Sequence, residues 1–331
     1  MPMIRAVLAG LAALALVLPA SGAGAAEKQK VSILLDWVPH GAHAGLHLAK
    51  QKGWFDEEGL DVEVLDGKGS TTTIQQLATG QVDFAFAQLG AMAAAVSNGL
   101  PVISVMGFVR GGDNGIVFPA DTSWKTLKDL TGKKVAVPSG SATATFFDAF
   151  LKAGGVSRDD YVIVNVDSSA EFTTYTSGFV DAAVASLGVF MPLVDEVRPS
   201  RAIFFSDVGL VIPGYGLIIR KSDLEPKADI IRKVVAVNKR SWDYIFAGHE
   251  EEAADAILAQ RDGLRLDRKV MLGQLKAYMP FFFTAATKDK PIGWQAESDW
   301  VAALKAMQQV GMVKPEFQPA DFYTNRFIAE K

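Results

Sequence analysis

Short apolar runs alternate with amphipathic stretches along most of the chain. Each run holds four to six residues rich in Val, Ile, Leu and Ala, which is typical of buried strands. The runs lie at residues 31–35, 62–65, 82–87, 101–106, 134–137, 162–166, 181–185 and 201–205. Between them, apolar positions recur at helical spacing, and several stretches end at a glycine. This alternation predicts crossover connections, and therefore an α/β fold with mainly parallel sheets.

The same pattern predicts the helices. They cover residues 42–52, 70–79, 91–98, 142–152, 189–197, 230–246, 250–260 and 294–310. Ser70 is the expected N-cap of the second of these, and Ser168 or Ser169 caps a further helix before residue 178. From about Asp229 onward the pattern is almost wholly helical. The last third of the chain therefore adds helices and no new strands.

A segment of eleven residues occurs twice. GQVDFAFAQLG at residues 80–90 is matched at seven of its eleven positions by GFVDAAVASLG at residues 178–188. This indicates one α/β unit built twice, although Gly, Ala and Val are common enough for chance to be the alternative. Gln88 and Ser186 occupy matching places in the two copies. Two similar lobes leave a cleft between them, and small ligands usually bind in such clefts.

The chain is therefore divided into two lobes. The alternation restarts after residues 121–130, and candidate crossings between the sheets lie near residues 115–119 and 211–216. After an N-terminal segment at residues 1–26, the predicted lobes are residues 27–115 with 216–331, and residues 116–215. We predict two open, mainly parallel sheets flanked by helices and joined by a two-segment hinge.

The first 26 residues have the form of a secretory signal. Arg5 precedes an apolar run at residues 6–18 that is too short to span a bilayer. Small residues follow, and Ala23, Gly24 and Ala25 form an expected cleavage site. No later run is long and apolar enough to cross a membrane. We therefore expect a periplasmic protein.

Composition narrows the class of protein. The chain of 331 residues has no cysteine, which excludes disulfides, thiolate metal sites, a Cys nucleophile and a lipoprotein anchor. Removing Arg5 from the 33 basic residues leaves 32 against 37 acidic ones, without a basic block. This balance argues against a nucleic-acid partner. Walker, Rossmann and G-x-S-x-G motifs are also missing, so the sequence favours a binding protein over an enzyme.

Several motifs resemble those of one family. They are LDWVPHGAHAGLH at residues 35–47, KGWF at 52–55, EGLDV at 58–62, LKDLTGKKV at 127–135 and DFYTNRF at 321–327. The chain resembles the periplasmic substrate-binding proteins of ABC importers in the thiamine-pyrimidine-precursor, nitrate, sulfonate and taurine superfamily. Within it, L-D-W-x-P followed by H-x-G is most similar to the branch for pyrimidine precursors of thiamine. The resemblance covers nearly the whole mature chain.

The resemblance implies a fold and a set of partners. The fold is that of a two-lobed, type II periplasmic binding protein, which closes on a small molecule and delivers it to an inner-membrane permease and its ATPase. It implies no cofactor and no catalytic residue, and we expect a monomer. The chain departs from the branch in three places: His40 replaces an Asn, His47 stands where the branch often has an aromatic residue, and residues 186–190 replace an acidic or aromatic residue followed by Pro. The related eukaryotic pyrimidine synthases carry a Cys-rich motif that this chain lacks.

The expected site lies beyond the carboxyl ends of the strands, where open α/β sheets bind ligands. We predict ligand-binding roles for Asp36, Trp37, His43, Ser70, Thr71, Gln88, Ser139, Ser141, Thr143, Ser186 and Tyr215. Trp37 follows a strand directly and offers a face for stacking on a ring, although packing beneath its own helix is the alternative. The hydroxyls of Ser139, Ser141 and Thr143 lie at a helix start, where they either bind a polar ligand group or cap the helix.

Three functions are compatible with these residues. The leading interpretation is a binder of a small, flat, mostly neutral heteroaromatic such as an aminopyrimidine precursor of thiamine. The second is a binder of taurine, alkyl sulfonate or nitrate, which would use Arg110 and the hydroxyl-rich helix starts. The third is an exported enzyme of pyrimidine metabolism, or a metal enzyme using the H-x2-H-x3-H spacing of His40, His43 and His47. Because His40 precedes the helix and only Asp36 stands nearby, we predict no metal site.

Overall fold

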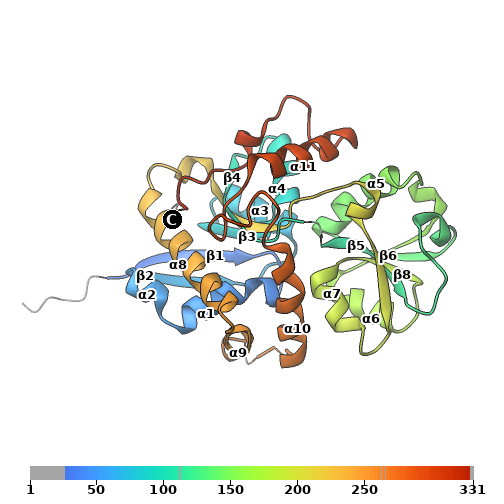
Figure 1. The fold of residues 1–331 in the computed structure, drawn as a ribbon, viewed down its shortest axis with the longest axis horizontal. Coiled ribbons are helices and arrows are strands. Elements are labelled where there is room, and N and C mark those ends of the chain that lie inside the picture. Colours follow the sequence, from blue (N-terminus) through green and yellow to red (C-terminus); the bar gives the residue numbers. More distant parts are fainter. Residues whose placement is uncertain (1–26, 112, 262, 265, 329–331) are drawn as a thin grey trace, which may run out of the picture.

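The computed structural model describes residues 27–111, 113–261, 263–264 and 266–328. The expected signal segment therefore lies outside the described residues. The chain forms two lobes side by side, and each lobe is a five-stranded sheet flanked by helices (Figure 1). Within the described residues, no helix has the length and apolar character needed to span a membrane.

The first lobe is built on a mixed sheet with the order β2-β1-β3-β10-β4. Its strands are β1 (Gln29–Leu35), β2 (Leu60–Leu65), β3 (Phe84–Gln88), β4 (Val102–Gly107) and β10 (Tyr215–Arg220). Strand β1 pairs in parallel with β2 and β3, whereas β10 runs antiparallel to both of its neighbours. Strands such as β3 are buried throughout, which explains why they read as continuous apolar runs.

The second lobe repeats this arrangement with the order β7-β6-β8-β5-β9. Its strands are β5 (Asn114–Pro119), β6 (Lys134–Pro138), β7 (Val162–Val166), β8 (Ala182–Ser186) and β9 (Ser200–Phe204). Strand β6 is parallel to β7 and β8, and β5 runs antiparallel to β8 and β9. The repeated segment of the sequence corresponds to β3 and β8, which hold the same position in the two sheets.

Each sheet thus contains one reversed strand, and this strand is the one that enters from the other lobe. The predicted parallel character holds for the other strands of each sheet. Asn114 and Gly115 pair with β8 in the second sheet, and Tyr215 pairs with β3 in the first. Each crossing therefore lies slightly before the predicted boundary.

The helices follow the predicted pattern with two differences. In chain order they are α1 (Ala44–Gln51), α2 (Trp54–Glu57), α3 (Ser70–Ala78), α4 (Leu89–Ser97), α5 (Ala142–Ala153), α6 (Glu171–Thr176), α7 (Leu187–Val194), α8 (Ala228–Phe246), α9 (Glu250–Ala259), α10 (Arg268–Tyr278) and α11 (Glu297–Gln309). Helices α2 and α10 were not predicted as separate elements. The N-cap of α3 is Gly69 and not Ser70, because Ser70 is already helical and its hydroxyl accepts a hydrogen bond from the backbone N–H of Gln88.

The two lobes touch at both sides of the cleft. On one side, α10 of the first lobe packs against α7 of the second, and the Gln274 side chain donates to the carbonyl of Val189 (3.0 Å). An ion pair between Lys269 of α10 and Glu196, in the turn after α7, joins the lobes at the surface. On the other side, a Cβ built on Gly69 would lie 2.4 Å from the carbonyl oxygen of Gly140. The structure therefore represents a closed arrangement of the lobes.

Candidate ligand-binding site

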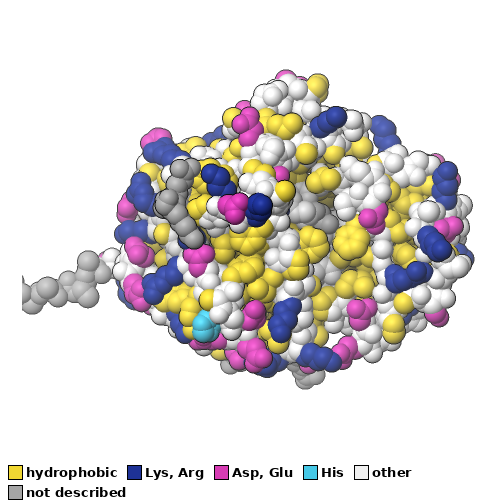
Figure 2. Space-filling view, in the orientation of Figure 1, with side chains coloured by type: hydrophobic (Ala, Val, Ile, Leu, Met, Phe, Trp, Pro, Cys, Tyr) yellow, Lys and Arg dark blue, Asp and Glu magenta, His cyan; other side chains and the backbone are white. Residues whose placement is uncertain are grey.

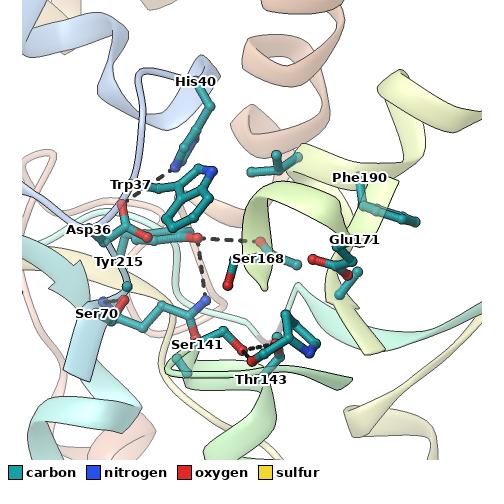
Figure 3. Close-up of a pocket in the computed structure, with 17 residues that line it drawn as sticks. Asp36, Trp37, His40, Ser70, Ser141, Thr143, Ser168, Glu171, Phe190 and Tyr215 are labelled. Carbon is teal, nitrogen blue, oxygen red and sulfur yellow. Dashed lines mark hydrogen bonds and ion pairs between the residues drawn. The ribbon is translucent and has the colours of Figure 1, made fainter. Parts of the chain in front are cut away.

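A cavity of about 100 Å³ lies between the lobes, at the carboxyl ends of β1, β3, β6 and β8 (Figure 3). Eight of the predicted site residues line it: Asp36, Trp37, Ser70, Gln88, Ser141, Thr143, Ser186 and Tyr215. The other three do not. The His43 side chain is fully buried behind Asp36, Thr71 is half-buried on α3 outside the cavity, and Ser139 is exposed to solvent.

Asp36, His40 and His43 form a buried hydrogen-bonded group at the end of β1. His40 and His43 cap a 3₁₀ turn at Gly41–His43, because each ring accepts a backbone hydrogen bond through Nδ1. The donors are the N–H of Ala42 to His40 (3.3 Å) and the N–H of His40 to His43 (3.2 Å). A neutral imidazole that accepts at Nδ1 carries its proton on Nε2. Both rings therefore present an Nε2–H donor.

These donors hold Asp36 as a carboxylate. His43 Nε2 donates to Asp36 Oδ1 (2.8 Å), and His40 Nε2 lies 3.5 Å from the same oxygen. Burial by itself would raise the pKa of Asp36, but the two imidazoles outweigh it and keep this pKa well below its usual range. Burial also lowers the pKa of His43 to about 3, so its ring is neutral. His40 Nε2 has no hydrogen-bond partner and lines the cavity with Asp36.

The same three residues bring potential metal ligands together. One ligand atom from each lies within 4.8 Å of the other two. A metal ion would need the lone pair of each Nε2, but the backbone hydrogen bonds to Nδ1 place a proton there instead. The H-x2-H spacing thus reflects a capping turn with two donors, which suits an organic ligand better than a metal. His47, the third histidine of the motif, contacts Gln260 through Nδ1 (3.0 Å).

Tyr215 connects the two copies of the repeated unit across the hinge. Its hydroxyl lies 3.3 Å from Gln88 Nε2 of the first lobe and 3.3 Å from Ser186 Oγ of the second. Gln88 and Ser186 each end a strand and precede a helix, which is why their side chains meet at the cleft. Tyr278 of α10 also reaches Ser186 Oγ (3.1 Å). Gln88 and Ser186, which the repeat predicted to occupy matching places, therefore both lie at the floor of the cavity.

Asp113 lies behind this floor, on the first crossing segment. Ser186 donates its hydroxyl to one carboxylate oxygen of Asp113, and the other oxygen has no partner. Asp113 is fully buried, and burial raises its pKa to about 6. The crossing segment thus carries a carboxyl group in the hydrogen-bond network of the site.

The second lobe contributes the start of α5. Ser141 is its N-cap: the hydroxyl accepts from the N–H of Ala144 (3.0 Å) and donates to the carbonyl of Pro138 (2.8 Å). It also lies 2.8 Å from the hydroxyl of Thr143. Capping and lining of the cavity therefore occur together at Ser141.

Sequence reasoning missed four polar or aromatic residues that line the cavity, namely His40, Ser168, Glu171 and Phe190. Glu171 opens α6 and points into the cavity (Figure 3). One of its oxygens is buried without a hydrogen-bond partner, and burial raises the pKa of the carboxyl group to about 8. An acidic residue in the first turn of a helix usually faces solvent, so the sequence held no signal for this placement.

The charges of the site are acidic. Among the described residues, the lining of the cavity includes Asp36 and Glu171 and neither Lys nor Arg. Arg110 lies elsewhere: it lines a separate cavity with Asp299, and its Nε donates to the carbonyl of Phe282 (3.4 Å). On the face drawn in Figure 2, charged side chains of both signs spread around the margin, and apolar side chains gather towards the middle.

A model of the NMT1/THI5 like family matches residues 40–253. The chain belongs to this family. The match confirms the resemblance found in the sequence. It includes His40 and His43, the two histidines that contact Asp36.

Named relatives of this family member differ in role. A Haemophilus influenzae protein whose name ties it to thiamine biosynthesis is 30% identical over 194 residues, which is 58% of this chain and 61% of that protein. The formylaminopyrimidine-binding protein of Halalkalibacterium halodurans is 25% identical over 71% of each chain. The 4-amino-5-hydroxymethyl-2-methylpyrimidine phosphate synthase of Aspergillus parasiticus is 24% identical over 91% of this chain and 87% of its own.

Solved structures confirm the two-lobed fold. The alkanesulfonate-binding protein SsuA of Xanthomonas axonopodis pv. citri superposes with a TM-score of 0.67 and covers 91% of this chain and 99% of its own. Its sequence identity is 17%, so the likeness concerns the fold alone.

Proposed function

We propose that this chain is the periplasmic solute-binding component of an ABC importer, and that it captures a small heteroaromatic by closure of its lobes. The ligand that fits best is a pyrimidine-type precursor of thiamine. The observation that carries this proposal is the lining of the cavity. It combines the aromatic side chains of Trp37, Tyr215 and Phe190 with the Asp36 carboxylate and the Glu171 carboxyl group, and it has no Lys or Arg among the described residues.

Each part of the lining has a role in this proposal. Trp37 stacks on one face of the ring, where aromatic pairs contribute about 0.5–1.5 kcal/mol beyond buried area. The edge of the ring carries both donors and acceptors, and it meets Asp36 and the Nε2–H of His40 from the first lobe. Closure excludes water and strengthens these hydrogen bonds.

The comparisons support the same ligand class at a coarser level. One relative is named as a formylaminopyrimidine-binding protein and another by thiamine biosynthesis. The signal-like segment at residues 1–26 supports export to the periplasm, and an inner-membrane permease with its ATPase would then receive the ligand.

An anion is the less favoured ligand. Sulfonate or nitrate would have to approach the Asp36 carboxylate without a compensating cation in the described lining. The sequence-based case for an anion depended on Arg110, and this residue lies in a different cavity.

We also propose that the chain is not an enzyme, although one relative is named as a pyrimidine phosphate synthase. The Cys-rich motif associated with the eukaryotic synthases has no counterpart, because the sequence has no cysteine. The one imidazole that lines the cavity, that of His40, presents a proton and no free lone pair to it.

Thermal unfolding with candidate ligands tests the function. A ligand at 100 times its dissociation constant adds about 2.7 kcal/mol to the free energy of unfolding and raises the melting temperature. We expect a rise with 4-amino-5-hydroxymethyl-2-methylpyrimidine and none with taurine or nitrate. A rise with taurine alone would favour the anion binder, and no rise with any heteroaromatic would refute the pyrimidine assignment.

A further inference from the structure

Glu171 is a side chain of the second lobe that lines the site with an unpartnered carboxyl oxygen. It comes from α6, and its carboxyl group lines the cavity opposite the loop that carries Asp36 and His40 (Figure 3). One oxygen is buried and accepts no hydrogen bond from any described residue. A buried carboxyl oxygen without a partner costs free energy, and natural proteins rarely keep one without a reason.

The position of Glu171 at a helix start does not explain it. Acidic residues are favoured in a first turn because they interact with free backbone N–H groups and with the helix dipole. The cap at the start of this region is made by another residue: Asp167 accepts from the N–H of Ser169 (2.8 Å). Glu171 accepts no such bond, and its carboxyl group faces the cavity.

No positive side chain offsets this carboxyl group. The described lining of the cavity has no Lys or Arg, and the Asp36 carboxylate of the first lobe already faces the two imidazoles of the capping turn. The missing partner therefore arrives with the ligand, as a hydrogen-bond donor. The carbonyl oxygen of a carboxyl group accepts whether the group is ionised or protonated, and an amino group is the donor that an aminopyrimidine carries on its ring.

We propose that Glu171 recognises the amino group of the ligand, so that this protein selects amino-substituted rings over the same rings without that group. This inference rests on the proposed function and adds to it the group that decides specificity. The second lobe would then contribute recognition as well as closure. A site built to bind a polar group rejects the analogue lacking that group, because the buried partner is left unsatisfied.

Titration calorimetry with two ligands and three proteins tests the inference. The ligands are 4-amino-5-hydroxymethyl-2-methylpyrimidine and its 4-deamino analogue, 5-hydroxymethyl-2-methylpyrimidine. The proteins are the wild type, Glu171→Met and Glu171→Gln. We expect the wild type to bind the amino ligand about 10- to 150-fold more tightly than the analogue. Glu171→Met should remove this preference, and Glu171→Gln should keep part of it because an amide oxygen still accepts.

The ratio of the two affinities is measured within each protein, so a general loss of stability does not imitate the effect. Glu316→Met, at an exposed position outside the cavity, is the matched control and should keep the wild-type ratio. An unchanged ratio in Glu171→Met would overturn the inference and leave the proposed function intact. If neither ring binds the wild type, both fail together.

Discussion

Substitution of Trp37 tests whether this side chain binds the ligand or packs in the core, because the first role affects affinity and the second affects stability. Its side chain is half-buried and lines the cavity, whereas Trp242 is 1% exposed in the core of the first lobe. We expect Trp37→Ala to cost about 1.5–3 kcal/mol of binding free energy, roughly 10- to 200-fold in affinity, with a small change in melting temperature. Calorimetry with the aminopyrimidine and thermal unfolding without it provide the two measurements.

Trp242→Ala is the control for that experiment. Truncating a buried Trp costs about 3–5 kcal/mol of stability. If Trp37→Ala lowered the melting temperature as strongly as Trp242→Ala and left the affinity unchanged, Trp37 would belong to the core and stacking would no longer support an aromatic ligand.

Glu171 also predicts a dependence of stability on pH. Burial raises its pKa from 4.5 to about 8. A carboxyl group with a raised folded-state pKa stabilises the fold fully below about pH 4.5, and this contribution is lost as the pH rises to about 8. The ligand-free Glu171→Gln variant lacks the titration. The melting temperature of this variant, minus that of the wild type, should therefore increase from about pH 5 to about pH 8. Above about pH 8 the difference should stay constant. A constant difference across that range would mean that the carboxyl group titrates normally.

Some residues of the site were predictable and others were not, for a physical reason. Asp36 and Trp37 follow a strand and Gln88 ends one, and the ends of strands can be predicted from a local apolar pattern. The roles of His40 and Glu171 depend on a backbone turn and on burial by the opposite lobe. Neither leaves a periodic trace in the sequence. The spacing of His40 and His43 even resembled a metal site, because a capping turn and a metal site both bring such rings together.

At the scale of elements, the loops before α3 and α5 touch through two glycines. Gly69 has φ +118°, and a Cβ there would overlap the carbonyl group of Gly140. We expect Gly69→Ala to hold the lobes apart and to weaken ligand binding about 10-fold or more, as measured by calorimetry. Gly178→Ala is the matched control, since Gly178 also has a positive φ (+78°) but no neighbour within 4 Å. An equal loss of affinity in both variants would indicate backbone strain alone.

Helix α10 shows why one helix could not be predicted from the apolar pattern of the sequence. Gly273 lies within it and weakens its local helical signal, although Asp267 caps it by accepting from the N–H of Val270 (2.9 Å). A Cβ on Gly273 would lie 3.4 Å from Pro192 of α7, an ordinary contact distance, so the packing does not require a glycine here. The sequence shows the cost of this glycine for the helix, whereas the packing of α10 against α7 joins residues far apart in the chain.

At the scale of the molecule, the contacts across the cleft predict a change in size. Those between α10 and α7, and between the two glycine loops, describe a closed form. A compact chain of about 300 residues has a radius of gyration of about 19 Å. We expect small-angle scattering to give a larger radius without ligand and this value with it. Gly69→Ala should keep the larger radius in both conditions. Equal radii for the wild type would indicate a site that is already closed.

The exchange of strands between the lobes also sets an order of folding. The second lobe is one continuous stretch, but the first sheet stays incomplete until β10 enters between β3 and β4. A chain that leaves a membrane channel N-terminus first must hold β4 unpaired and one edge of β3 open while about a hundred further residues emerge, and exposed strand edges aggregate readily. Pulse-labelled hydrogen exchange during refolding should therefore protect β6 and β8 before β3. Strand β3 would then leave the channel before the second lobe and yet complete its pairing after it.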